Sequence, residues 1–371
     1  MKKFSLTLAA AALAAVLVGC SSPKHEPAEL VSFTPAINVS EVWSVSMPNA
    51  DGFLVPGLFD ESVWVAGGKE LARLDARTGN KEWTVSFDSP VVGGVGTDGY
   101  NTAVGLENGE LVVLNAEGKE DWKSKLTSEL AVPPVITNGL VIVRTKDMRV
   151  SAFEASSGEQ QWTFQRNQPA LTVRVPISMT ARDNFLFVGQ PNGNVVILDV
   201  NNGRPVFEFP VAQAKGITEV ERLIDVVGAP VLNADMLCAA AYQGAVTCIN
   251  STNGQMMWTQ NVDAIAGPAV DEDNVYVVDV TGVVRAYYRE SGELRWENKT
   301  MTYRGLSAPV IMPGTVAVGD NEGYVHLLSP RTGEEIARTR LSGPIVTKAQ
   351  SFSAGAIFQT SKGDVAYLAT R

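Results

Sequence analysis

Short apolar runs separated by turn-forming pairs recur along most of the chain. Residues 90–126 illustrate the unit: apolar runs at 90–95, 102–106 and 111–114 precede a fourth run that contains Trp122. Asn-Gly and similar pairs lie between the runs and supply the positive φ that tight hairpin turns require. The pattern predicts four short strands per unit. The inner runs are almost wholly apolar, which is typical of strands that are buried on both faces.

The unit returns with a period close to 40 residues. A turn that ends in glycine precedes an aromatic residue by four positions, as with Gly79 and Trp83. Successive turn glycines are 39, 40, 45, 51, 38 and 41 residues apart, ending at Gly333. A period near 40 with several strands per repeat is typical of a β-propeller. The expected structural aromatics are Trp83, Trp122, Trp162, Phe207, Trp258 and Trp296, and Ala337 takes the aromatic's place in the last copy.

The two ends of the folded part complement each other. After Gly333 only three strands remain, whereas residues 41–45 resemble an isolated fourth strand, with Trp43 standing 40 residues before Trp83. We therefore predict an all-β fold over residues 41–371. It is an eight-bladed β-propeller of four-stranded antiparallel blades, closed by the N-terminal strand, and closure removes exposed sheet edges. Helical periodicity is limited to residues 217–227.

The N-terminus indicates export and lipid attachment. Lys2 and Lys3 precede an apolar run to Val18, which is too short for a membrane span but suits a signal peptide. The run ends in Leu-Val-Gly-Cys, which resembles a bacterial lipobox. We expect a signal peptide at 1–19 that is removed, a lipidated Cys20, and a flexible tether at 20–40. The alternative is an ordinary secretory signal with a chance cysteine. By resemblance to other lipoproteins, the absence of Asp after the cysteine favours the periplasmic face of the outer membrane.

The charge balance limits the kinds of partner. Removing residues 1–19 leaves 352 residues with 28 basic and 40 acidic side chains, a net charge of −12. Such a surface repels nucleic acid and anionic headgroups. We therefore expect no nucleic-acid partner, and a membrane partner only through the lipid anchor.

The glycine-turn and tryptophan repeats resemble the tryptophan-docking repeats of the pyrroloquinoline-quinone (PQQ) dehydrogenases. Combined with a lipobox and eight such repeats, they resemble the BamB family, the propeller lipoproteins of the outer-membrane β-barrel assembly machinery. The resemblance covers the whole mature chain. It implies a non-enzymatic scaffold that binds the periplasmic POTRA domains of the barrel-forming subunit and aids outer-membrane protein folding and insertion. Unfolded outer-membrane proteins are possible further partners.

Two stretches resemble the partner-binding loops of that family: residues 171–174 and the insertion at 216–225. They occupy the connections between the third and fourth repeats and between the fourth and fifth, which we expect on one face of the disc. Val173 replaces the family's second leucine, and the family's second carboxylate is absent after Asp225. The resemblance implies apolar contact by some of these residues and charged or polar contact by the others; they are Leu171, Val173, Arg174, Glu221, Arg222 and Asp225.

The sequence offers little catalytic chemistry. His326 is the only histidine of the folded part, so no multi-histidine metal site or Ser-His-Asp relay is expected, and we interpret it as a packed core residue near the axis. No phosphate-binding loop follows a strand, and no cofactor is expected. The alternatives are a PQQ-dependent dehydrogenase, which would need calcium ligands and lacks the vicinal cysteines of many members, or an envelope-binding propeller of another role.

Cys238 and Cys248 lie on the two strands of one hairpin, and the exported compartment permits a disulfide. A two-residue turn would place them on opposite faces of the sheet. A three-residue turn with Gly244 as a bulge would pair Ala241 with Ala245 and set the cysteines opposite each other. The sequence leaves both registers open.

Overall fold

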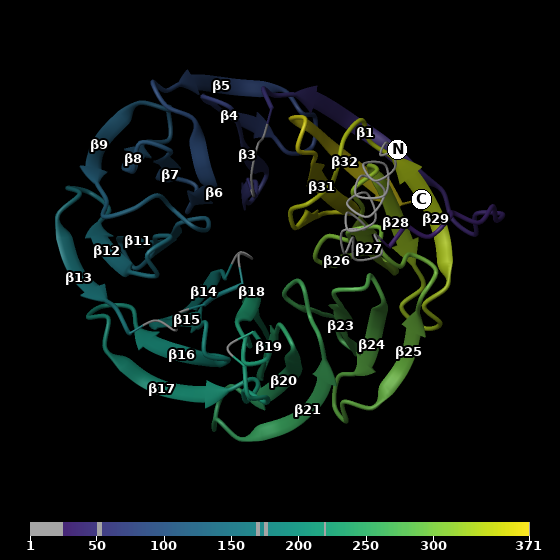
Figure 1. Cartoon of the computed structure of the whole chain (residues 1–371). Helices are drawn as coiled ribbons and strands as arrows, with labels where there is room; N and C mark the ends of the chain where they lie inside the picture. Colours follow the sequence, from purple (N-terminus) through teal and green to yellow (C-terminus); the bar gives the residue numbers. More distant parts are fainter. Residues whose placement is uncertain (1–24, 50–53, 168–170, 174–176, 219, 371) are drawn as a thin grey trace, which may run out of the picture.

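The computed structural model describes residues 25–49, 54–167, 171–173, 177–218 and 220–370. Within these ranges the chain forms eight four-stranded antiparallel sheets, arranged as blades around a central axis (Figure 1). The predicted all-β, eight-bladed propeller is confirmed. The described ranges contain no α-helix that is long and apolar enough to cross a membrane.

We number the blades from 1 to 8 in chain order, and in each the first strand lies nearest the axis. Blade 1 contains β2 (Gly57–Phe59), β3 (Ser62–Gly67), β4 (Glu70–Asp75) and β5 (Lys81–Ser86). Blade 2 contains β6 (Val91–Thr97), β7 (Thr102–Leu106), β8 (Glu110–Leu114) and β9 (Glu120–Lys125). Blade 3 contains β10 (Val135–Thr137), β11 (Leu140–Arg144), β12 (Val150–Glu154) and β13 (Gln160–Phe164). Blade 4 contains β14 (Met179–Arg182), β15 (Phe185–Gly189), β16 (Asn194–Asp199) and β17 (Pro205–Pro210).

The second half of the ring repeats the arrangement. Blade 5 contains β18 (Val226–Asn233), β19 (Met236–Ala241), β20 (Gly244–Asn250) and β21 (Met256–Val262). Blade 6 contains β22 (Ala269–Val270), β23 (Asn274–Val278), β24 (Val284–Tyr288) and β25 (Leu294–Asn298). Blade 7 contains β26 (Val310–Met312), β27 (Thr315–Gly319), β28 (Tyr324–Leu328) and β29 (Glu335–Arg340). Blade 8 contains β30 (Gln350–Phe352), β31 (Gly355–Gln359), β32 (Asp364–Thr370) and β1 (Val39–Ser46).

The ring closes within blade 8, where the two ends of the chain meet. β1 pairs antiparallel with β32, from Val39 opposite Thr370 to Ser46 opposite Asp364. In Figure 1 the purple β1 lies along the outside of the yellow β32. The first ordered strand of the chain therefore completes the last blade, as the sequence predicted.

The core is divided among the seams of the ring. Eight apolar clusters each combine buried side chains from two neighbouring blades, and together they cover every seam. The middle strands are buried on both faces, because each sheet packs against a sheet on either side. This explains the nearly continuous apolar runs in the sequence.

An aromatic side chain from the outer strand of one blade docks on the last turn of the next. Trp43 Nε1 donates a hydrogen bond to Ala76 O at 2.9 Å, and a Cβ on Gly79 would lie only 2.7 Å from the Trp43 ring. Gly79 also has a φ of +74°, so this turn needs glycine for two reasons. The docked pairs are Trp43 with Gly79, Trp83 with Gly118, Trp122 with Gly158, Trp162 with Gly203, Phe207 with Gly254, Trp258 with Gly292 and Trp296 with Gly333.

The structure explains why Ala337 stands where the other repeats have an aromatic residue. It faces blade 8, whose third and outer strands are the two ends of the chain, so no turn joins them and no glycine is presented to an aromatic ring. The segment before β1 occupies this seam instead. Ile37 of this segment and Val39, the first residue of β1, pack against its core, and Ala36 N donates to Ile336 O at 2.8 Å.

Residues 25–38, expected within a flexible tether, lie against blades 6 and 7. Ala28 N donates to Thr302 O at 2.9 Å, and the His25 ring stacks on Tyr303 with 4.3 Å between ring centroids. For these residues the expectation of a free tether is wrong, because backbone and side-chain contacts hold them along the edge of the disc. Residues 20–24 and the signal peptide lie outside the described residues.

Cys238 and Cys248 form a disulfide between β19 and β20, with Cα atoms 4.1 Å apart. They are directly opposite in the register, which is that of the three-residue turn. The residue with positive φ in this turn is Gln243, at +46°, rather than the expected bulge at Gly244.

Candidate functional site

The two enlarged loops lie together on one face of the disc. They are residues 165–178, between β13 and β14, and residues 211–225, between β17 and β18. In an antiparallel meander, every connection from an outer strand to the next blade's inner strand leaves from the same face. The loops also touch, because Val173 N donates to Asp225 Oδ2 at 2.7 Å. We call residues 171–173, 211–218 and 220–225 the loop surface.

Asp225 lies beneath the loop surface and connects its two loops through the hydrogen bond from Val173 N. Its side chain is fully buried, whereas the resemblance led us to expect that it makes polar contact with a partner. Burial raises the pKa of Asp225 to about 6, against the opposing effects of the Val173 amide and the charge of Arg144. A carboxylate in this position orients the neighbouring loop rather than meeting a partner directly.

Arg144 supports the same junction from β11. The buried guanidinium donates to Gly189 O at 2.7 Å and to Ile177 O at 3.3 Å, which links blade 3 to blade 4. Desolvation lowers the pKa of Arg144 to about 10, and the charge of Asp225 opposes this shift. The base of the loop surface is therefore fixed by a buried cation and a buried carboxylate.

The exposed side chains of the loop surface surround a shallow cleft of about 590 Å³. Leu171 and Arg222, which the sequence placed in one site, both line it. Leu171 is exposed and Val173 is half-buried. Glu221 is exposed, and one carboxylate oxygen accepts hydrogen bonds from Ile217 N and Thr218 N, both at 3.0 Å; these bonds lower the pKa of Glu221. Arg174 lies outside the described residues.

Two further residues of the insertion stand out in the structure. The side chains of Ile217 and Val220 are 96% and 59% exposed. The sequence signal in this stretch was the helical periodicity of 217–227. The described residues of 217–225 form bends, turns and irregular chain rather than a helix, and Val226 and Val227 begin β18. Ile217 and Val220 therefore lie on an irregular loop and face solvent. Exposed apolar side chains on a loop are typical of protein-binding surfaces.

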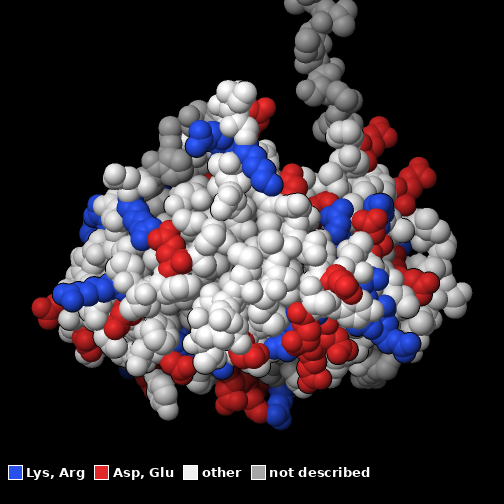
Figure 2. Space-filling model, turned by 90° about the horizontal axis from the view of Figure 1, so that it is seen from below, with Lys and Arg blue, Asp and Glu red and all other residues white. Residues whose placement is uncertain are grey.

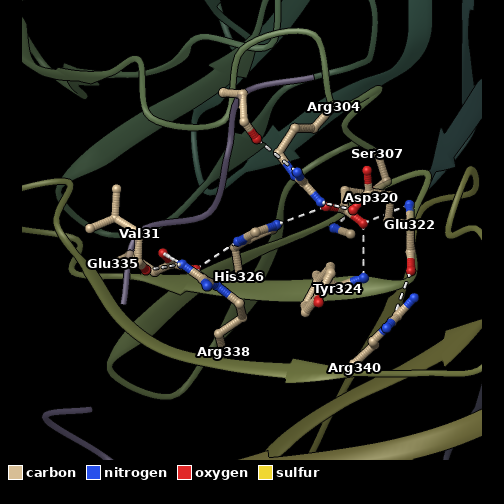
Figure 3. A network of polar contacts seen from close by, with 12 residues as sticks. Val31, Arg304, Ser307, Asp320, Glu322, Tyr324, His326, Glu335, Arg338 and Arg340 are labelled. Atoms are coloured by element: carbon tan, nitrogen blue, oxygen red, sulfur yellow. Dashed lines mark hydrogen bonds and ion pairs between the residues drawn. The ribbon is translucent and has the colours of Figure 1, made fainter. Parts of the chain in front are cut away.

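A second polar cluster, inside blade 7, joins the N-terminal segment to the ring (Figure 3). Asp320 Oδ2 accepts hydrogen bonds from Arg304 Nε at 2.7 Å and from His326 Nε2 at 3.1 Å, and all three side chains are buried. His326 Nδ1 lies 2.6 Å from Glu335 Oε1. His326 is thus the centre of an ionic cluster in the third strand from the axis, and not the axial core residue expected from the sequence.

The cluster keeps its groups charged. Burial alone would lower the pKa of His326, but hydrogen bonds with Asp320 and Glu335 outweigh it and raise that pKa above its ordinary 6.5. Burial likewise raises the pKa of Asp320, but hydrogen bonds from His326, Tyr324 N and Arg304 lower it overall. Arg304 also donates to Ala28 O at 2.9 Å, which ties the N-terminal segment to the cluster. Nothing in the spacing of these residues indicated their association.

On the side shown in Figure 2, Lys and Arg side chains are interleaved with Asp and Glu, and no continuous basic surface is visible. The docked aromatics and the eight closed blades define a class of protein: closed, tryptophan-docked β-propellers.

Comparisons with known proteins identify the family within this class. A family model described as "Outer membrane protein assembly factor BamB" matches residues 67–298 and 280–370. Proteins of that name from Bordetella pertussis and Burkholderia pseudomallei are 35% and 36% identical, and each alignment covers 94% of this chain and 93% of the relative. The chain belongs to the BamB family of outer membrane protein assembly factors.

Solved structures agree with this assignment. The crystal structure of BamB from Moraxella catarrhalis matches with a TM-score of 0.83 and 27% identity, covering 90% of this chain and all of the other. A quinohemoprotein alcohol dehydrogenase from Pseudomonas putida matches with a TM-score of 0.68 and 13% identity. The second likeness reflects the shared fold alone.

Proposed function

We propose that this chain is a non-enzymatic scaffold lipoprotein of the outer-membrane β-barrel assembly machinery. Its loop surface binds the periplasmic POTRA domains of the barrel-forming subunit and so aids the folding and insertion of outer-membrane proteins. The observation that carries the proposal is the joining of the two enlarged loops through Asp225 and Val173, in a chain of the BamB family. Exposed Leu171 and Ile217 give this surface apolar contact area, and exposed Arg222 adds a residue type that is enriched at binding hot spots.

The dehydrogenase alternative finds little support in the residues at the axis. The described residues that line the axial cavity include no carboxylate, and the described chain contains no cluster of three or more His, Cys, Asp or Glu suited to a metal ion. Calcium prefers several oxygen ligands, usually including carboxylates. These residues therefore do not fit the calcium and PQQ of the structurally similar dehydrogenases.

Charge reversal and apolar loss on the loop surface test the proposal. We expect Ile217→Ser with Arg222→Glu to reduce co-purification of the barrel-forming subunit by about tenfold or more, since a hot-spot side chain typically contributes about 2 kcal/mol or more. The melting temperature should stay unchanged, because Ile217 is almost fully exposed. Arg174→Glu and the pair Leu171→Ser and Val173→Ser extend the test to the stretch that resembles the family motif.

The matched control is Arg331→Glu. Arg331 lies in the turn between β28 and β29, on the opposite face, and is an exposed arginine without an ion pair among the described residues. We expect this variant to co-purify the subunit normally. Unchanged co-purification in all the loop variants, or an equal loss with Arg331→Glu, would place the interface elsewhere.

Lipid attachment at Cys20, which lies outside the described residues, is part of the same proposal. We expect Cys20→Ser to give a folded propeller that stays in the soluble fraction after a high-salt wash of membranes. Each buried methylene of an acyl chain contributes about 0.8 kcal/mol, so loss of several chains removes stable anchoring. Fractionation measures whether the variant has left the membrane, and a melting curve of the released protein measures whether it is folded. A variant that still sediments with washed membranes would rule out lipid as the anchor.

A further inference from the structure

The axis of the ring holds a cavity of about 530 Å³ that neither the loop surface nor the ionic cluster uses. Its wall is made mainly by segments that lead into or begin the innermost strand of seven of the eight blades; examples are residues 131–135, 265–268 and 346–350. Asn321, in the turn between β27 and β28, is added to them. Because these segments follow the connections between blades, the cavity opens on the face that carries the loop surface. Its volume is within the range of small-molecule sites in proteins.

The lining has one formal charge. Valine, alanine, proline and glycine predominate among the described lining residues, and Lys348 is the only ionisable side chain. Desolvation lowers the pKa of Lys348, because protein atoms surround the ammonium group and no carboxylate compensates for the lost water. The described residues provide no hydrogen bond or ion pair for this group. An unpaired ammonium in an apolar wall favours a negatively charged ligand.

Two neutral hydrogen-bonding groups accompany the charge. The Thr347 hydroxyl and the Asn321 side-chain amide also line the cavity, and neither has a side-chain hydrogen bond within the described chain. Ser307 and Gln350, the other long or hydroxyl-bearing polar residues near them, are already engaged: Ser307 Oγ accepts from Gly319 N at 2.9 Å, and Gln350 Nε2 donates to Pro56 O at 2.9 Å. Thr347 and Asn321 therefore lie with Lys348 on blades 7 and 8, and Ser178, between blades 3 and 4, is a further lining residue with an uncommitted hydroxyl.

We propose that the axial cavity binds an apolar monocarboxylate, with Lys348 as its counter-ion. The carboxylate takes a charge-assisted hydrogen bond from Lys348 and neutral ones from Thr347 and Asn321, while the apolar group lies against the valine and proline wall. A single cation fits one negative charge, and a polyanion would bring further charge into a wall whose described residues offer no second cation. The C-terminus of a polypeptide with an apolar last residue and a free aliphatic acid share this chemistry.

The test is titration calorimetry of the full mature protein with octanoate and with the peptide N-acetyl-Ala-Ala-Phe bearing a free C-terminal carboxylate. Octanol and the C-terminally amidated peptide are the uncharged counterparts. We expect one site per chain for octanoate, for the free-carboxylate peptide or for both, and at least about tenfold weaker binding of the matching uncharged probe. Binding of only one of the two carboxylates identifies the source, a free acid or a chain terminus.

Lys348→Met supplies the decisive comparison. It keeps the length of the side chain and removes the charge, so carboxylate binding should weaken by about tenfold or more, while the melting temperature should rise or stay the same because a desolvated charge is lost. Lys348→Arg should retain binding in part. Lys362→Met, an exposed lysine on the same blade outside the cavity, should change nothing.

The pH dependence gives an independent readout. Binding should be lost as the pH rises through the pKa of Lys348, which lies below its ordinary 10.5. The proposal is overturned if neither carboxylate binds, if the uncharged probes bind equally well, or if Lys348→Met binds as the unsubstituted protein does. None of these results bears on the loop surface, whose test is co-purification of the barrel-forming subunit.

Discussion

A mature protein that begins at residue 47 is expected to lose its cooperative fold. Such a chain lacks β1, so β32 becomes an unpaired edge and the Trp43 ring leaves the seam between blades 8 and 1. Loss of a large buried aromatic alone typically costs about 3–5 kcal/mol, against a total stability of roughly 5–15 kcal/mol. Circular dichroism during heating and urea titration would measure the loss.

Two shorter truncations separate the contributions of the segment. Starting the chain at residue 25 should leave the melting temperature unchanged, since every described contact is kept. Starting it at residue 39 keeps β1 but removes the contacts of Ala28 and Ala36, and should lower stability by an intermediate amount. If the chain that begins at residue 47 melts as the full mature protein does, closure through β1 contributes nothing.

Replacing Asp320 by alanine is expected to cost about 3–5 kcal/mol, because it leaves the buried Arg304 and His326 without their shared carboxylate. The other oxygen of Asp320 also accepts hydrogen bonds from Glu322 N and Tyr324 N, at 2.9 and 2.8 Å. Chemical unfolding at several pH values would measure the change.

The pKa shifts of Asp320 and His326 determine the pH range in which Asp320→Ala lowers the stability most. The folded state lowers the pKa of Asp320, so its stabilisation is complete above the ordinary 3.8 and is lost as the pH falls through the lowered value. The folded state raises the pKa of His326, so its stabilisation is complete below 6.5 and is lost as the pH rises through the raised value. The variant should therefore differ most from the unsubstituted protein between pH 3.8 and 6.5.

A matched control is Asp75→Ala. Asp75 likewise accepts two backbone hydrogen bonds in a turn, from Arg77 N at 3.0 Å and Thr78 N at 2.8 Å, but it makes no buried ion pair. We expect a cost of about 1 kcal/mol there. Equal costs for the two substitutions would show that the ionic cluster adds nothing beyond turn capping.

The sequence repeat made the propeller architecture predictable. Individual contacts between residues of different repeats could not be predicted from it. A 40-residue period with a glycine turn and an aromatic specifies each seam locally, so the ring and its closure by residues 41–45 could be inferred. The position of Asp225 depends on Val173 N and on Arg144, which are 52 and 81 residues away. No local pattern encodes such a meeting, and the carboxylate was therefore placed on the surface.

The same limit applies to residues 25–38. Their composition of Ser, Pro and Glu indicated a free tether, because they lack the periodicity of a strand or helix. Their order comes from Arg304 and Arg338 of blade 7, which reach Ala28 O and Val31 O at 2.9 and 3.2 Å. A segment held by its neighbours' side chains has no signature in its own sequence.

The attachment of this segment determines how the molecule would stand on a membrane. His25 stacks on Tyr303, in a connection between blades on the face that carries the loop surface. His25 follows the proposed lipid-bearing Cys20 by five positions in the chain, a span of at most roughly 18 Å. This face of the propeller would thus be turned towards the bilayer, and the short connection to the lipid would keep it close to the membrane surface. A partner in the same membrane would then meet the loop surface at a high effective concentration, so that even a weak contact could remain occupied.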